Sequence, residues 1–461
     1  MYLSKFQLFN YKSFYDSEMM EFNPGINIIA GQNNSGKTAL LEALTLNFQN
    51  IPHRSLKTLP DASSQPEGES MASIVLTFDK KDLPILFEQI GNSLWIPAPP
   101  DSPNAVNPIH TYTDWINSSG IAELSVNVRP NLKLLETDNA LYKLNFELYP
   151  VPNIIRKNQT LLCFNIKRDK NNTFGSYGSS SSDYSTTIGW RLFENFKRGI
   201  FRFYAERLNI GRCSVGTGNK LAQNASNLAQ VLHVMQSDNS SKFNRYNGFV
   251  SEIFPNIKRI GISLISSGEV EINVWTVDPE SERSDLAYPI SACGTGIGQV
   301  LSILYVVMNS NDARVIIIDE PQSFLHPGAA KKLIEILRIK FPQHQYFIST
   351  HSPTIIAASN PSSIVMLRYK DCESVASVMD AQDSGDLRLL LDDIGVSLSD
   401  IFGADNILWV EGQTEEKCFP LILEKIGKRP LMGTNILTVR ATGEFETEKK
   451  KLILYLTFMK K

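Results

Sequence analysis

The sequence predicts an α/β protein in which helices cover a mixed, mostly parallel sheet, and two observations carry this prediction. The first is an alternation of helix-forming and apolar strand-like segments from residue 300 onward: 300–308 and 329–339 as helices, 315–318 and 345–349 as strands. The second lies near the N-terminus, where an apolar segment runs into a glycine loop and then into a helix-forming segment. Alternation of this kind is typical of parallel strands joined by helices.

The elements that precede this region are mainly strands. Apolar positions alternate over 3–9, which is typical of an edge strand, and the pattern breaks at 10–14. Further segments rich in apolar and β-branched residues predict strands over 26–30, 72–79, 141–148 and 161–167. The Gly- and Ser-rich segment 171–187 predicts a mobile surface loop. Apolar spacing between 220 and 254 predicts helices, within a helical insertion over about 190–260.

Composition narrows the class of protein. The 461 residues include 45 Lys and Arg against 48 Asp and Glu, a net charge of −3, so a polycationic binder is excluded and any DNA site must be a local basic patch. The five cysteines are scattered without a C-x-x-C pair, which disfavours a zinc site and a disulfide framework. We find neither a signal peptide nor about 18 uninterrupted apolar residues. The sequence therefore predicts a cytoplasmic protein without a membrane partner.

The glycine loop matches the phosphate-loop (Walker A) pattern G-x-x-x-x-G-K-T in full. Backbone N–H groups of such a loop wrap phosphate oxygens, the lysine adds positive charge, and the threonine hydroxyl ligates Mg²⁺. We therefore predict ATP binding by seven residues of the segment: Gly31, Asn33, Asn34, Ser35, Gly36, Lys37 and Thr38. Either Asn33 or Gln32 faces the γ-phosphate, and the spacing does not decide between them.

A second apolar strand, 315–318, ends in Asp319 and Glu320. An acid at the end of a buried strand is the expected partner of a phosphate loop. We predict that Asp319 binds the metal with Thr38, and that Glu320 polarises the attacking water.

Several motifs resemble those of the heads of ABC-type ATPases and of the structural-maintenance-of-chromosomes (SMC) proteins. Residues 10–14 (NYKSF) look like the start of such heads, and 291–299 (SACGTGIGQ) are similar to their signature loop. The resemblance implies that Ser291, Gly294 and Gly296 contact the nucleotide of a second subunit, in an ATP-dependent dimer. It also implies that His351 contacts the γ-phosphate or the attacking water. His326 is equally consistent with a nucleotide contact and with a structural role.

The segment 410–415 (VEGQTE) closely resembles the opening motif of the TOPRIM domain of topoisomerases, primases and the OLD (overcoming lysogenization defect) nucleases. The resemblance implies a Mg²⁺ site, open also to Mn²⁺ or Ca²⁺, with Glu411 as the catalytic glutamate and Glu415 as the next acid. The family's later Asp-x-Asp strand has no counterpart before Lys461. Two acids do not suffice for two metal ions. A truncated form, a naturally shortened variant and acids borrowed from a partner all remain open.

The combined motifs predict an OLD-family protein with an ABC-type ATPase head over 1–400 and the first part of a TOPRIM domain over 404–461. Long SMC-type arms are excluded, because no sustained heptad pattern separates the motifs. The resemblance implies ATP hydrolysis coupled to metal-dependent DNA cleavage in antiphage defence by a homodimer or higher oligomer. The alternative is a nuclease-inactive ATPase scaffold or sensor that regulates a separate effector. A RecF-type repair ATPase is the third candidate, disfavoured by the segment 410–415.

Overall fold

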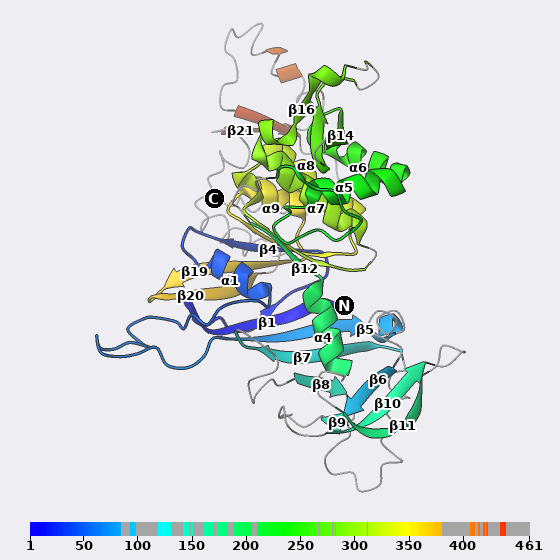
Figure 1. Cartoon of the computed structure of the whole chain (residues 1–461). Helices are drawn as coiled ribbons and strands as arrows, with labels where there is room; N and C mark the ends of the chain where they lie inside the picture. The colour runs from blue at the N-terminus through cyan, green and yellow to red at the C-terminus, as the bar shows by residue number, and fades with distance from the viewer. Residues whose placement is uncertain are drawn as a thin grey trace.

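The structure of the chain is a computed structural model (Figure 1). It describes residues 1–83, 119–130, 188–204, 210–265, 268–278, 281, 283–310 and 312–379, the backbone of strands in the remaining segments, and a few positions between 414 and 422. Among these residues, no helix has both the length and the apolar character needed to cross a membrane.

A six-stranded sheet forms the centre of the molecule. Its strand order is β12 (Ile200–Phe203), β17 (Val315–Asp319), β18 (Gln345–Thr350), β4 (Ile26–Gly31), β19 (Ser363–Lys370) and β20 (Glu373–Met379). The first five strands are parallel and β20 is antiparallel, so the predicted mixed α/β fold is confirmed. Because parallel strands end at the same edge of a sheet, the phosphate loop after β4 and the acids after β17 are brought together.

Helices and a second sheet bury the two faces of the central sheet. In β17, Val315 and Ile317 belong to a core shared with α1 (Lys37–Leu44) and the N-terminal strands. Ile316 and Ile318 belong to a core on the other face. That face is covered by α5 (Leu228–Asp238), α6 (Ser240–Ile253), α7 (Thr295–Asn309), α8 (Pro327–Lys340) and α9 (Pro353–Ser359) (Figure 1). Burial on both sides explains the unbroken apolar run of β17.

The N-terminal sheet packs beyond α1. It contains β1 (Tyr2–Tyr11), β2 (Phe14–Asp16), β3 (Met20–Glu21), β5 (Met71–Asp79), β7 (Ile121–Val128), β8 (Tyr142–Phe146) and β9 (Tyr149–Pro150), and η1 (Lys80–Asp82) follows β5. The prediction of an edge strand at 3–9 was wrong. β1 pairs with β5 on one side and with β2 and β3 on the other, because the chain turns at Lys12 (φ 49°) and folds back on it.

The predicted loop at 171–187 was also wrong. β11 (Phe174–Ser182) pairs antiparallel with β10 (Leu161–Arg168), which pairs in turn with β6 (Ser93–Pro97). Strand formation by serine and glycine here depends on pairing with a neighbouring strand, which outweighs intrinsic propensity.

Three helices lie in the range 190–260, but this range also supplies a strand of the central sheet. α4 (Ile188–Arg198), α5 and α6 agree with the helical prediction, whereas β12 was not predicted. A small sheet of β13 (Cys213–Ser214), β14 (Arg259–Ile265), β15 (Glu269–Trp275) and β16 (Ala287–Pro289) adjoins α5, with η4 (Ser284–Leu286) before β16. β21 (Asn406–Val410) and β22 (Thr434–Thr438) form a separate parallel pair.

Candidate functional site

The phosphate loop connects β4 to α1, and its glycines are required by geometry. Gly31 (φ 156°) and Gly36 (φ 101°) both adopt positive φ. A Cβ atom on Gly31 would lie 2.5 Å from the carbonyl oxygen of Leu367, its partner in β19. A Cβ on Gly36 would lie 2.5 Å from Oγ of Ser374. Any larger residue at either position would therefore displace the loop from the sheet edge.

The groups around this loop fit a bound phosphate. The start of α1 has neither an acidic residue in its first turn nor a side-chain cap, so its N–H groups face an anion site. Oγ of Ser35 is buried and has no hydrogen-bond partner among the described residues. Asn33, Asn34 and Thr38 are exposed, as residues that face a ligand must be.

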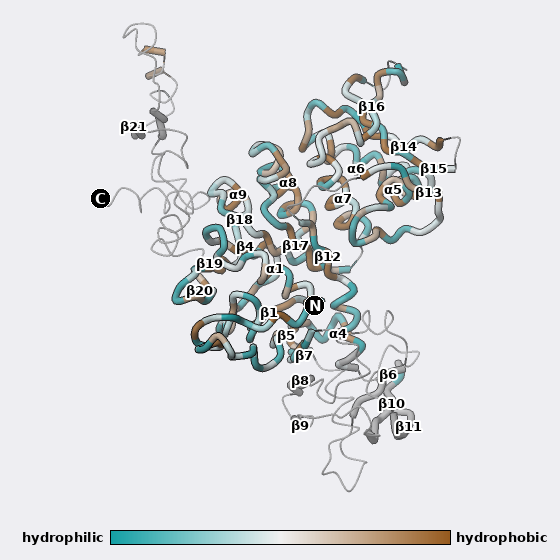
Figure 2. The backbone as a smooth tube through the Cα atoms, turned by 60° about the vertical axis from the view of Figure 1, so that its left-hand side comes forward, coloured by the Kyte–Doolittle hydropathy of each residue, from teal (hydrophilic) through white to brown (hydrophobic). Residues whose placement is uncertain are grey.

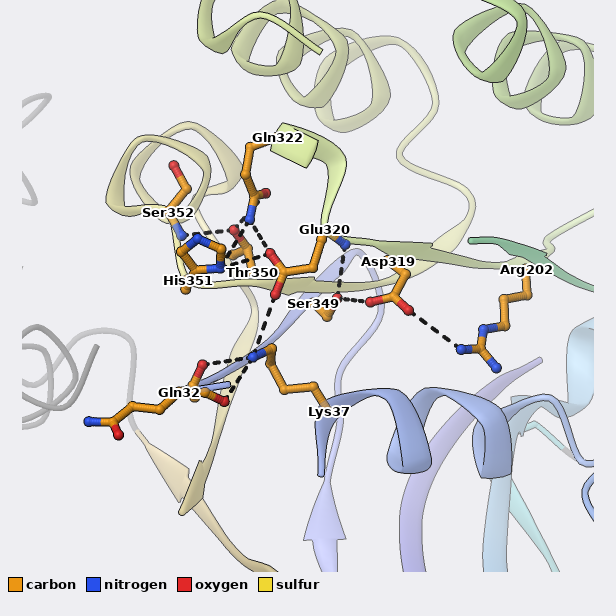
Figure 3. Close-up of polar contacts among 11 residues, drawn as sticks. Gln32, Lys37, Arg202, Asp319, Glu320, Gln322, Ser349, Thr350, His351 and Ser352 are labelled. Carbon is orange, nitrogen blue, oxygen red and sulfur yellow. Dashed lines mark hydrogen bonds and ion pairs between the residues drawn. The ribbon is translucent and has the colours of Figure 1, made fainter. Parts of the chain in front are cut away.

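Lys37 is buried, and its ammonium group is turned back into the loop. Its Nζ donates to the carbonyl oxygens of Gly31 (2.9 Å) and Gln32 (3.0 Å). It also lies 3.5 Å from Oε1 of Glu320 (Figure 3). The lysine thus links the phosphate loop directly to the acid that follows β17.

Glu320 is held by three side chains. Besides Lys37, His351 Nδ1 lies 3.0 Å from its Oε2, and Gln322 Nε2 donates to the same oxygen (Figure 3). Its backbone is left-handed (φ 45°), an arrangement that costs about 1 to 3 kcal/mol and persists where its surroundings fix it. Here its N–H donates to the Ser349 carbonyl (3.1 Å). The structure therefore brings together Lys37, Glu320 and His351, which the sequence assigned to one site.

Asp319 occupies the last position of β17 and is almost fully buried. Its Oδ1 accepts a hydrogen bond from Oγ of Ser349 (2.6 Å), and its Oδ2 lies 3.5 Å from a guanidinium nitrogen of Arg202. Asp319 and Thr38 supply only two oxygen ligands, and no group of three or more His, Cys, Asp or Glu side chains suited to a metal occurs in the described part of the chain. A divalent cation here would therefore need oxygens from phosphate and water.

The signature-like segment lies apart from this site. Ser291 is in the exposed turn η5 (Ile290–Ala292), which follows β16 and precedes α7. Figure 2 shows β16 well separated from α1. Gly294 is exposed at the start of α7, where no side chain caps the helix. Gly296 has a packing role, because a Cβ atom there would lie 2.1 Å from the carbonyl oxygen of Phe324. Ser291 and Gly294 are thus available to another molecule rather than to the phosphate loop of their own chain.

His326 has a structural position. Its Nδ1 accepts a hydrogen bond from the N–H of Gly328 (3.3 Å) and so caps α8, which follows the short helix η6 (Pro321–Ser323). Of the two roles that the sequence left open, the geometry favours the cap.

Glu411 and Glu415 lie outside the described residues. β21 ends at Val410, immediately before Glu411, and pairs in parallel with β22.

Three residues of the site escaped sequence reasoning: Arg202, Gln322 and Ser349. The signal for Arg202 is a lone arginine in the short apolar strand 200–203. Gln322 stands two residues after Glu320, and its Oε1 accepts from Oγ1 of Thr350 (3.0 Å). Ser349 lies on β18, next to β17, and sequence spacing alone does not reveal that pairing.

Comparison with known proteins agrees with this geometry. The model of a family described as an AAA ATPase domain matches residues 1–356. A segment of 92 residues is 32% identical to the DNA double-strand break repair Rad50 ATPase of Archaeoglobus fulgidus, and the match spans 20% of this chain and 10% of that protein.

Solved structures that are similar to this chain include three SMC heads. The SMC head domain from Thermotoga maritima is 13% identical, with a TM-score of 0.39, and the match covers 82% of this chain and 100% of that one. A Smc head bound to the C-terminal domain of ScpA derived from Pyrococcus furiosus is 10% identical, with a TM-score of 0.44 over 85% of this chain and 99% of that one. A SmcHead bound to the C-winged helix domain of ScpA is 12% identical, with a TM-score of 0.43 over 82% and 98%.

Proposed function

Because the chain belongs to the AAA ATPase domain family, we propose that it binds Mg²⁺ and ATP at the phosphate loop and hydrolyses the nucleotide in the cytosol. The observation that carries the proposal is the convergence of Lys37, Glu320 and His351 at one edge of the central sheet. Nucleotide binding and phosphate release by the purified chain, each with and without Mg²⁺, test it. Binding that depends on the phosphate loop, with release of phosphate, is the expected result.

Each residue of the site has its own role in binding or hydrolysis. N–H groups of residues 33–38 and Nζ of Lys37 bind the phosphates. Thr38 and Asp319 would hold the Mg²⁺, which would neutralise negative charge on the phosphates. Glu320 orients the water and accepts its proton, and His351 keeps the Glu320 carboxylate in place. The ammonium group of Lys37 lies 3.5 Å from Oε1 of Glu320, so its positive charge also acts on that carboxylate. Phosphate in the loop gives that charge a second partner and leaves Glu320 free to contact water.

We also propose that two copies of the chain associate in the ATP-bound state through Ser291 and Gly294, while Gly296 keeps its packing role within the chain. The exposure of Ser291 and Gly294, apart from the phosphate loop of the same chain, supports this proposal.

Ser291→Arg tests the dimer. An arginine in the exposed turn is expected to lower ATP turnover about tenfold or more, because it blocks a contact made only in the closed dimer, while ATP affinity stays unchanged. Turnover and nucleotide binding are measured on the same preparations. Ser281→Arg, at another exposed serine, is the matched control. Its ATP affinity and ATP turnover are expected to equal those of wild type. Loss of affinity and turnover together would contradict the dimer contact.

A second proposed activity is metal-dependent DNA cleavage by a TOPRIM domain over 404–461, as in OLD-family nucleases of antiphage defence. It is supported by the apolar strand β21 directly before Glu411 and by its parallel partner β22. Glu411 and Glu415 would bind the metal. The alternative is an ATPase that controls a separate effector.

Glu411→Ala separates these activities. If Glu411 is a metal ligand, the variant is expected to lose Mg²⁺- or Mn²⁺-dependent plasmid nicking by about two orders of magnitude, because the metal supplies several kcal/mol of transition-state stabilisation. ATP turnover is expected to stay at the wild-type level. Glu416→Ala, just outside the motif, is the control. Nicking that persists in Glu411→Ala would contradict the metal site, and a wild-type chain that nicks nothing, alone or with its neighbouring gene products, would favour the effector-controlling ATPase.

A further inference from the structure

Arg202 is buried against the acid that the proposed function assigns to the metal. Its side chain is 6% exposed and that of Asp319 is 8% exposed. Arg202 Nη2 lies 3.5 Å from Asp319 Oδ2, and Ser349 donates to Oδ1 (Figure 3). Both oxygens of Asp319 therefore have a positively polarised partner within the chain.

The strand that carries Arg202 is anchored to α7, the helix that begins within the signature-like segment. Gln299 of α7 is fully buried, and its side-chain amide donates to the carbonyl oxygen of Tyr204, just after β12. The ring of Tyr204 lies 4.5 Å from the guanidinium carbon of Arg202. Since the backbone next to Arg202 is fixed by this hydrogen bond, the distance from Arg202 to Asp319 depends on where the guanidinium group lies.

The guanidinium group is incompletely satisfied. Nε of Arg202 is buried and has no hydrogen-bond partner within the described residues, although a guanidinium carries five N–H donors. A second carboxylate lies nearby. Burial favours the neutral form of Glu42, but the hydrogen bond from Lys12 and the charges of Lys12 and Arg202 outweigh it, so the pKa of Glu42 is below its ordinary value. Glu42 stands four residues after Thr38, on the same face of α1.

We propose that Arg202 is a positioning residue that holds Asp319 in the metal-free protein and competes with the divalent cation for that carboxylate. The inference rests on the proposed function, because it requires Asp319 to be a metal ligand. Two cationic groups do not share one carboxylate oxygen without repulsion. By linkage, any free energy that the Arg202 contact contributes to the metal-free state lowers the metal affinity by the same amount.

Arg202→Met tests the inference, because methionine keeps much of the side-chain length and removes the charge. Binding of a fluorescent ATP analogue to the full chain is titrated with Mg²⁺. Arg202→Met is expected to lower the half-saturating Mg²⁺ concentration about tenfold, equivalent to about 1.4 kcal/mol. Its affinity for the analogue in EDTA is expected to match wild type. Arg202→Lys retains the charge and is expected to restore most of the wild-type Mg²⁺ dependence.

Thermal melting separates positioning from a purely structural role. Arg202→Met is expected to lower the melting temperature without metal, since it leaves a buried carboxylate unpaired, and the deficit should narrow with Mg²⁺ and nucleotide. An equal deficit in both conditions with an unchanged Mg²⁺ requirement would overturn the inference. If Arg202→Met does not fold, Tyr204→Leu at a half-exposed position serves instead. It is expected to lower the half-saturating Mg²⁺ about two- to threefold by removing the ring beneath the guanidinium, and no change would overturn the inference.

Failure of this inference is distinguishable from failure of the proposed function. A wild-type chain that binds no nucleotide with Mg²⁺ would contradict the proposed function. A wild-type chain with Mg²⁺-dependent binding, whose Arg202 variants show the same dependence, would contradict only the role of Arg202.

Discussion

Lys37→Ala is expected to reduce ATP turnover by about 10²- to 10³-fold and to weaken ATP binding, because the fixed positive charge at the phosphates is lost. The same change frees Glu320 from its 3.5 Å contact with Nζ and removes two hydrogen bonds to the loop carbonyls. The measurements are nucleotide affinity by titration and phosphate release at saturating ATP.

The control for Lys37→Ala is Lys331→Ala. Lys331 is exposed on α8 and outside the site, so that variant is expected to bind and hydrolyse ATP as wild type does. Thermal melting verifies that Lys37→Ala is folded. Wild-type affinity and turnover in folded Lys37→Ala would contradict the assignment of the phosphate loop.

Glu320→Gln is expected to lower ATP turnover without weakening ATP binding, whereas Lys37→Ala is expected to lower both. Removal of a general base lowers turnover by about 10²- to 10⁴-fold. ATP affinity is expected to be retained or increased, because the amide no longer competes as an anion for Lys37. Glutamine has the same shape as glutamate, so the left-handed backbone and the contact with Gln322 impose no new steric demand.

The trapped state of Glu320→Gln can be observed directly. Size-exclusion chromatography with Mg²⁺ and ATP is expected to show a dimer that persists in this variant and decays in wild type. Glu335→Gln, on α8, is the control for loss of a carboxylate elsewhere and is expected to hydrolyse ATP normally. Hydrolysis by Glu320→Gln at the wild-type rate would assign the base to another residue.

Local sequence patterns were sufficient to predict the centre of the fold and many residues of the candidate site. The β-branched run of β17 and the glycine loop before Lys37 have strong local signals, and the structure places them at one edge of a sheet. Parallel pairing then brings His351, from beyond β18, to within 3.0 Å of Glu320.

Features that depend on distant pairing were not predictable. Arg202 reaches Asp319 because β12 pairs with β17, 115 residues along the chain, and nothing near residue 202 indicates that partner. β11 forms because β10 offers an antiparallel partner to serines and glycines of low strand propensity. β1 is an interior strand because two short strands fold back on it, which its own alternating pattern does not reveal.

The central claim is that this chain hydrolyses ATP with Glu320 as the base. Its most direct test is phosphate release from Mg²⁺ and ATP by wild type and Glu320→Gln, measured beside bound nucleotide on the same samples. We expect steady release by wild type, and full nucleotide occupancy with release slowed by about 10²-fold or more in Glu320→Gln. Equal release by the two proteins, or ATP that stays bound and uncleaved in wild type, would contradict it.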